Sequence, residues 1–166
     1  MVNQLIKEIN IALEHDCYLI ALASVLTLPD ICGKAKYPHA KTSVRYKNWY
    51  DTYIGQYEKS PECSYEWVNK IPYASGDIVY SIRNALLHDA NLQDVREEQE
   101  LTDFHLLISK SDTLGVISGI DADGKEKTIS IGIRNLCGKI CNAAQWYYQN
   151  NKDKFHFDYN VIEWEI

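Results

Sequence analysis

The sequence lacks the excess of basic charge that marks most nucleic-acid-binding domains. It has 17 Lys and Arg residues against 23 Asp and Glu residues, which gives a formal net charge of −6. This balance does not favour broad nucleic-acid binding, so any role in nucleic-acid binding must depend on a local site. Hydrophobic residues make up 46% of the chain, which argues against disorder. We therefore expect one folded domain over residues 1–166.

The sequence also lacks a cysteine pattern typical of disulfides or zinc sites. Its five cysteines are an odd number without tight pairing: Cys17, Cys32, Cys63, Cys137 and Cys141. We predict reduced thiols, with no metal and no other cofactor. No charged-then-apolar leader opens the chain, and the apolar stretch 17–28 is too short for a membrane span. We therefore expect a cytoplasmic protein with no membrane partner.

The stretch 77–90 has the pattern of an amphipathic helix. Ser75, Gly76 and Asp77 form a helix start signal, with Asp77 placed where an N-cap or first-turn carboxylate is favoured. At about 100° per residue, five apolar residues fall on one side, as a core face should. They are Ile78, Val79, Ile82, Ala85 and Leu86.

The opposite side of this helix has an unusual composition. It carries Tyr80, Asn84 and Leu87, flanked by Arg83 and His88, and it has no Lys or Glu. An ordinary solvated helix face carries charged residues of those two types. The composition therefore predicts a surface that meets another protein surface or a substrate.

Two helices are expected before this one, at 3–27 and at 42–57. The first has an apolar stripe at helical spacing, and 29–33 supplies the Pro and Gly that would end it. The second interleaves basic and aromatic side chains: Arg45, Tyr46, Lys47, Trp49, Tyr50 and Tyr53. This pattern suits stacking on bases and pairing with phosphates, but it equally suits a helix that packs through aromatic rings. We favour packing and keep the nucleic-acid alternative open.

Beyond residue 101 the spacing of apolar residues changes from helical to alternating. Segments 104–108, 116–120 and 128–133 have the pattern of β-strands, and 121–124 has the composition of a tight turn. A last helix is expected over about 133–151, with apolar residues on one face.

These segments together predict a mainly α fold. Its helical core covers 3–91 and 133–151, and a small β-hairpin or three-strand insertion covers 103–133. The tail, 152–166, alternates enough from Phe155 onward to add an edge strand or to reach a partner chain.

The six residues from Arg83 to His88 resemble the signature of HEPN domains. In that family an Arg and a His are separated by four to six residues, and the residue after the Arg is often polar, as Asn84 is here. The stretch 28–33, followed by Tyr37-Pro38 and Trp49-Tyr50, also resembles uncharacterised bacterial and phage proteins of this type. The resemblance covers 3–91 and the last helix, so the strand region would be a family-specific insertion.

The resemblance implies both a fold and an activity. HEPN domains are antiparallel helical bundles, and many are metal-independent ribonucleases in toxin–antitoxin, antiviral defence and RNA-processing systems. It implies an RNA endonuclease that needs no cofactor, acts on RNA as a homodimer, and has an antitoxin or another protein as a further partner. The acidic net charge departs from this pattern, because it offers less attraction for RNA than a ribonuclease usually has.

The spacing of Arg83 and His88 sets a geometric expectation. Residues five apart lie about 140° from each other around an α-helix, so we expect that they cannot easily act on one phosphate as a pair within one helix. Two copies packed through the face of Tyr80, Asn84 and Leu87 could bring both Arg–His sets to one cleft. The resemblance implies the same composite site.

Each site residue then has an expected role. His88 could take a proton from an RNA 2′-hydroxyl or give one to the leaving 5′-oxygen. Arg83 would stabilise charge on the phosphoryl oxygens, and Asn84 could orient the imidazole or the phosphate. Tyr80 could stack on a base or pack at the dimer interface with Leu87, and Asp77 is expected as a helix cap that supports the site.

A second function class stays open at this point. An Arg and a His at a helix end are often structural, since a cation there interacts well with the helix dipole. The chain could therefore be a non-catalytic HEPN-like module that dimerises and binds a partner protein or a nucleotide.

Overall fold

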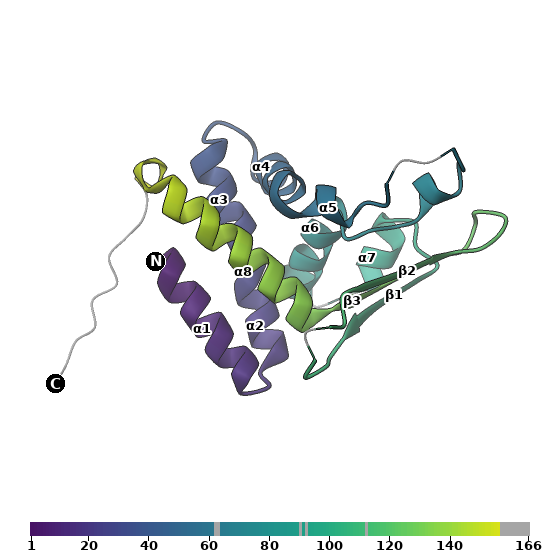
Figure 1. Ribbon diagram of the computed structural model, residues 1–166, viewed down its shortest axis with the longest axis horizontal. Coiled ribbons are helices and arrows are strands. Elements are labelled where there is room, and N and C mark those ends of the chain that lie inside the picture. Colours follow the sequence, from purple (N-terminus) through teal and green to yellow (C-terminus); the bar gives the residue numbers. More distant parts are fainter. Residues whose placement is uncertain (62–63, 90, 92, 112, 157–166) are drawn as a thin grey trace.

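Helices dominate the structure, and a small sheet lies at one end of the molecule (Figure 1). The computed structural model describes residues 1–61, 64–89, 91, 93–111 and 113–156. The mainly α class is confirmed, as is the position of the strand region directly before the last helix.

The N-terminal part forms three helices: α1 (Val2–Glu14), α2 (Tyr18–Val25) and α3 (Leu28–Lys36). The expected single helix over 3–27 is therefore wrong. The helix is interrupted at Asp16, whose φ of 57° lies in the left-handed region that a right-handed helix cannot contain. Because of this break, α1 and α2 pack against each other instead of forming one rod (Figure 1).

The residues expected to end the first helix instead belong to α3. Pro29 lies in its first turn, where the missing N–H costs nothing, and Gly33 lies inside it. A Cβ at Gly33 would lie only 2.6 Å from the carbonyl oxygen of Arg45. Gly33 therefore serves the close approach of α3 to the next helix and not a turn.

One segment of the described chain, Tyr18–Lys36, has the length and apolar composition of a membrane-spanning helix. Its mean hydropathy is 1.3, and 56% of it is buried inside the fold. A core helix meets the same criterion, and this segment is divided between α2 and α3.

The second predicted helix is continuous from residue 42 to residue 58, as expected. It comprises α4 (Thr42–Tyr50), the π-helical turn η1 (Asp51–Gly55) and α5 (Gln56–Glu58). Its three largest aromatic side chains are fully buried: Tyr46, Trp49 and Tyr50. Packing was therefore the correct interpretation for these three rings, and none of them is accessible to a base.

The helix that carries the signature begins at Gly76. After the short 3₁₀ turn η2 (Val68–Lys70) come α6 (Gly76–Asn84), the π-helical turn η3 (Ala85–Asp89) and α7 (Gln93–Glu98). The predicted core face is confirmed: four of its residues are buried, and the fifth, Leu86, packs against the core.

The start of α6 is fixed by two contacts. Ser75 is the N-cap, and its Oγ accepts a hydrogen bond from the backbone N–H of Ile78 (3.3 Å). Gly76 meets α4 so closely that a Cβ there would lie 2.7 Å from the carbonyl oxygen of Lys47. Ser75 is therefore the cap, and of the two positions expected for Asp77 the structure shows the first-turn carboxylate and not the N-cap.

The strands and the last helix occur where the sequence predicts them. β1 (Asp103–Leu107), β2 (Val116–Ile120) and β3 (Lys127–Gly132) form a sheet of order β1-β3-β2, in which β1 and β3 are parallel and β2 is antiparallel to β3. β3 continues directly into α8 (Ile133–Asn150), which crosses the bundle in Figure 1.

The chain ends, for the described part, with the 3₁₀ turn η4 (Lys152–Lys154). Most of the tail for which an edge strand or a partner contact is expected, 157–166, lies outside the described residues. An aromatic cluster joins α8 to the α4–η1 helix, since the ring centroid of Tyr147 lies 6.0 Å from that of Trp49 and 5.2 Å from that of Tyr53.

Candidate functional site

Arg83 and His88 are in contact within one chain. Nη1 of Arg83 lies 3.1 Å from Nε2 of His88. The expectation that one helix would hold them about 140° apart is wrong, because the chain from Ala85 to Asp89 is a π-helical turn. A π turn places residues five apart on the same face, so the side chains of Arg83 and His88 can meet.

A hydrogen bond between Nη1 of Arg83 and Nε2 of His88 can have only one direction. A guanidinium can donate hydrogen bonds but has no lone pair with which to accept one. In a hydrogen bond between these two atoms, Nε2 of His88 is therefore the acceptor, and the ring proton lies on Nδ1. In this arrangement Arg83 orients a neutral imidazole that has a basic nitrogen on the Arg83 side.

Asn84 orients the guanidinium and not the imidazole. Its Oδ1 accepts a hydrogen bond of 2.9 Å from the same Nη1 of Arg83. The Nε atom of Arg83 is buried and has no hydrogen-bond partner among the described residues, and the same holds for the hydroxyl of Tyr46. The Arg83 head group thus lies half-buried at the edge of the core, next to an exposed His88.

Tyr80 is part of the packing beneath this pair. Its ring meets that of Tyr46 edge-on, with centroids 5.1 Å apart, and it is only partly exposed. Cζ of Arg83 lies 5.8 Å from the Tyr80 centroid, within the range of a cation–π contact. Leu87, by contrast, is 39% exposed and is available to a partner.

Lys47 is the site residue that the helix pattern alone did not identify. Its Nζ lies 5.3 Å from the Tyr80 centroid and 2.6 Å from Oδ1 of Asp77. Two cations from different helices therefore lie beside one ring, Lys47 from α4 and Arg83 from α6. The alternation of basic and aromatic residues in 45–53 was the signal that could have pointed to Lys47.

Asp77 is the first-turn carboxylate of α6 and not its cap. It lies in the first turn of α6, where a carboxylate is favoured by the helix dipole, and it pairs with Lys47. It is one of two carboxylates at this helix start, because Oδ1 of Asp51 accepts a hydrogen bond of 2.7 Å from the N–H of Gly76. Burial raises the pKa of Asp51, and the charge of Asp77 raises it further.

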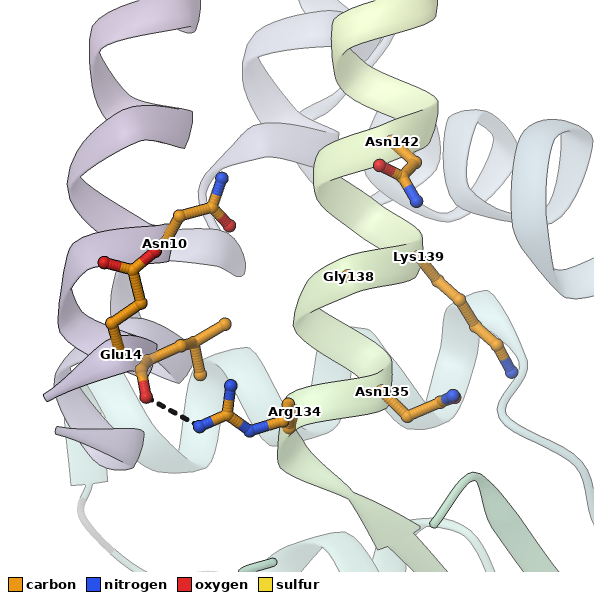
Figure 2. A pocket seen from close by; sticks show the side chains of 8 residues that line it. Asn10, Glu14, Arg134, Asn135, Gly138, Lys139 and Asn142 are labelled. Carbon is orange, nitrogen blue, oxygen red and sulfur yellow. Dashed lines mark hydrogen bonds between the residues drawn. The ribbon is translucent and has the colours of Figure 1, made fainter. Parts of the chain in front are cut away.

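A polar hollow of about 450 Å³ lies between α1 and α8, and it includes none of these residues. Figure 2 shows it in front of Gly138, where a Cβ would meet nothing within 4 Å. Its charged groups are largely engaged: Arg134 donates to the carbonyl oxygen of Leu13 (2.7 Å), and Lys139 pairs with Glu58 (2.6 Å). The hollow is therefore a groove between α1 and α8 in which most charged side chains already have partners. It contains no residue of the stretch from Arg83 to His88.

The cysteines of the described chain are unpaired, as expected, and three of the four are buried: Cys32, Cys137 and Cys141. Burial raises the pKa of Cys137 to about 12 and that of Cys141 to about 11, which keeps both thiols protonated at neutral pH. Cys63 lies outside the described residues. Across the described ranges, no three His, Cys, Asp or Glu side chains gather where they could hold a metal ion.

Asp16 is a structural carboxylate. Its Oδ1 accepts a hydrogen bond from the Tyr18 hydroxyl (2.7 Å), and its Oδ2 lies 3.0 Å from Nζ of Lys110. The hydrogen bonds from Tyr18 and Lys110 lower the pKa of this carboxyl. These contacts hold the Asp16 carboxylate at the break between α1 and α2.

Comparisons with models of protein families, with curated proteins and with solved structures find no match to this chain.

Proposed function

We propose that this protein is a HEPN-like RNA endonuclease that acts as a homodimer and requires no metal, in a toxin–antitoxin or antiviral defence setting. The observation that carries the proposal is the 3.1 Å contact between Nη1 of Arg83 and Nε2 of His88. It joins a phosphate-binding group to a proton-transfer group at an accessible position of the helix. The mainly helical fold and the late position of the signature in its helix support the same proposal.

The binding step follows from the chemistry of Arg83. The planar guanidinium suits the oxygens of a phosphodiester, which compete for the N–H groups that now face His88. When Nη1 turns to a phosphoryl oxygen, Nε2 of His88 loses its donor and becomes an available base. Substrate binding and the activation of His88 are thereby coupled through one atom.

The chemical step uses the 2′-hydroxyl of RNA. Nε2 of His88 accepts the 2′-hydroxyl proton as the 2′-oxygen forms a bond to phosphorus, and the bond from phosphorus to the 5′-oxygen breaks. Arg83 stabilises the negative charge that develops on the phosphoryl oxygens. The products are a 2′,3′-cyclic phosphate and a 5′-hydroxyl end, so DNA is not a substrate.

Two copies complete the site in this proposal. The leaving 5′-oxygen needs a proton donor on the side opposite the base, and one chain supplies one His88. A two-fold dimer through the exposed Leu87 would bring the partner subunit's His88 to the other side of the same phosphate, where that ring, in its protonated imidazolium form, would give its proton to the 5′-oxygen.

Purified protein incubated with RNA and with DNA of the same sequence, in the presence of a chelator, tests the proposal. We expect the protein to cleave the RNA and not the DNA. Arg83→Ala and His88→Ala should each lower the cleavage rate by about 10²-fold or more, as is usual for removal of a charge-stabilising or acid–base group. His39→Ala, which removes another exposed imidazole, is the matched control and should retain activity. Equal cleavage by all four proteins, or none by the wild type, would contradict the proposal.

One observation favours the second candidate, a non-catalytic interaction module. Nη1 of Arg83 already has partners within the chain, Asn84 and His88, as expected for side chains that only stabilise the end of a helix. Expression in cells separates the two functions. A nuclease predicts toxicity that Arg83→Ala and His88→Ala remove, whereas a module predicts equal growth for the wild type and both variants.

A further inference from the structure

We propose that Lys47 binds a second phosphate of the RNA, next to the phosphate held by Arg83, and that Asp77 competes with that phosphate for Lys47. This inference rests on the proposed function and names the substrate contact beyond the signature. It assigns to α4 a part of the site that is otherwise built from α6 and η3.

Three distances place Lys47 at the site. Its Nζ lies 5.3 Å from the Tyr80 ring centroid, and Cζ of Arg83 lies 5.8 Å from the same centroid. The third distance is the 2.6 Å ion pair between Lys47 and Oδ1 of Asp77. One partly exposed ring therefore lies beside both cations. Sites for single-stranded nucleic acid combine cations along the phosphate backbone with aromatic rings in this way.

The backbone holds Lys47 in this place. Gly76 allows the start of α6 to reach the carbonyl oxygen of Lys47, where any Cβ would come within 2.7 Å. The same approach brings Asp77, the next residue, to the Lys47 ammonium. The position of Lys47 relative to Arg83 is thus set by the packing of α4 on α6 and not by a long flexible loop.

The existing ion pair leaves Lys47 available to a phosphate. The Lys47 side chain is 34% exposed and that of Asp77 is 59% exposed. Ion pairs that open to solvent are weak, so a phosphodiester can displace the carboxylate. The Asp77 charge opposes that exchange. The proposal therefore predicts that removal of the carboxylate increases the affinity for RNA.

Fluorescence anisotropy with a labelled single-stranded RNA, measured from 50 to 200 mM salt in the inactive His88→Ala background, tests this. Each phosphate contact with a single strand adds about 0.7 to the slope of log affinity against log salt. Lys47→Gln should weaken binding several-fold and lower that slope by about 0.7, and Asp77→Asn should strengthen binding. Lys59→Gln, an exposed lysine beyond α5, is the matched control.

Two results would overturn the proposal: Lys47→Gln indistinguishable from Lys59→Gln, or Asp77→Asn weakening binding as Lys47→Gln does. A merely structural ion pair predicts that both partner substitutions act in the same direction, since each breaks the same contact. Failure here is separable from failure of the nuclease proposal, which is decided by the dependence of cleavage on Arg83 and His88. Circular dichroism of each variant shows whether the helices are retained.

Discussion

Nη1 of Arg83 and Nε2 of His88 lie 3.1 Å apart, although the two residues are five positions apart in the chain. The π-helical turn from Ala85 to Asp89 produces this contact, because its hydrogen bonds run between residues five apart. Such turns are rare inside helices and are frequent at functional sites. One copy of the chain therefore already pairs the guanidinium with the imidazole, and the proposed reaction needs a second copy only for its second proton transfer.

Gly76→Ala should destabilise the fold, whereas Gly138→Ala should stabilise it. A Cβ at Gly76 would lie 2.7 Å from the carbonyl oxygen of Lys47, and such overpacking costs about 1–3 kcal/mol. A Cβ at Gly138 would meet nothing within 4 Å, and Ala is better than Gly in a helix by about 1 kcal/mol. Urea denaturation measures both changes. Equal effects from the two substitutions would contradict the close approach of α6 to α4.

Asp51→Asn should change the pH dependence of stability. Burial raises the pKa of this carboxyl in the folded protein, so the folded state favours the protonated form more than the unfolded state does. Stability from this group is therefore present at low pH and is lost as the pH rises through its folded pKa.

The Asn variant does not undergo that loss, so its melting temperature relative to the wild type should increase between about pH 4 and pH 7, above the ordinary Asp pKa. Thermal melts across this range measure the difference. Asp123→Asn, in an exposed turn, is the control. A difference that stays constant or decreases with pH would show that Asp51 is not a desolvated carboxyl.

Leu87→Asp should convert the proposed dimer to a monomer. Leu87 is a 39% exposed apolar residue beside the Arg83–His88 pair, and a charge at a two-fold contact would face its own copy. Sedimentation gives the mass in solution. Ile20→Asp, which changes a 65% exposed residue on α2, should leave the mass unchanged. A dimer mass retained by Leu87→Asp would place the interface elsewhere.

Much of the fold can be predicted because apolar residues recur with clear helical or strand spacing. The three strands and α8 occur where the alternation changes, and the core face of α6 follows from 3.6-residue spacing. The break at Asp16 was not predictable, since no Gly or Pro marks it and apolar residues continue on both sides. Gly33 and Pro29 were identified as helix-ending signals, but local propensity could not show that a neighbouring helix needs Gly33 as a contact point.

The residues of the candidate site can be selected from the sequence, but their geometry cannot. The polar composition around Arg83, Asn84 and His88 stood out because an ordinary surface helix lacks it. Their contact depends on a π turn, which an assumed 100° per residue cannot represent. Lys47 needed the tertiary structure, because it belongs to a different helix and reaches the site only where α4 and α6 pack together.

The chemical ends of the cleaved RNA test the central claim most directly. In the proposed reaction, His88 activates the 2′-hydroxyl beside a phosphate held by Arg83. In the presence of a chelator, mass spectrometry of the products should therefore show 2′,3′-cyclic phosphate and 5′-hydroxyl ends, and a single 2′-deoxy substitution at the cleavage site should stop the reaction. Products with 5′-phosphate ends, or cleavage that persists at the 2′-deoxy position, would contradict it.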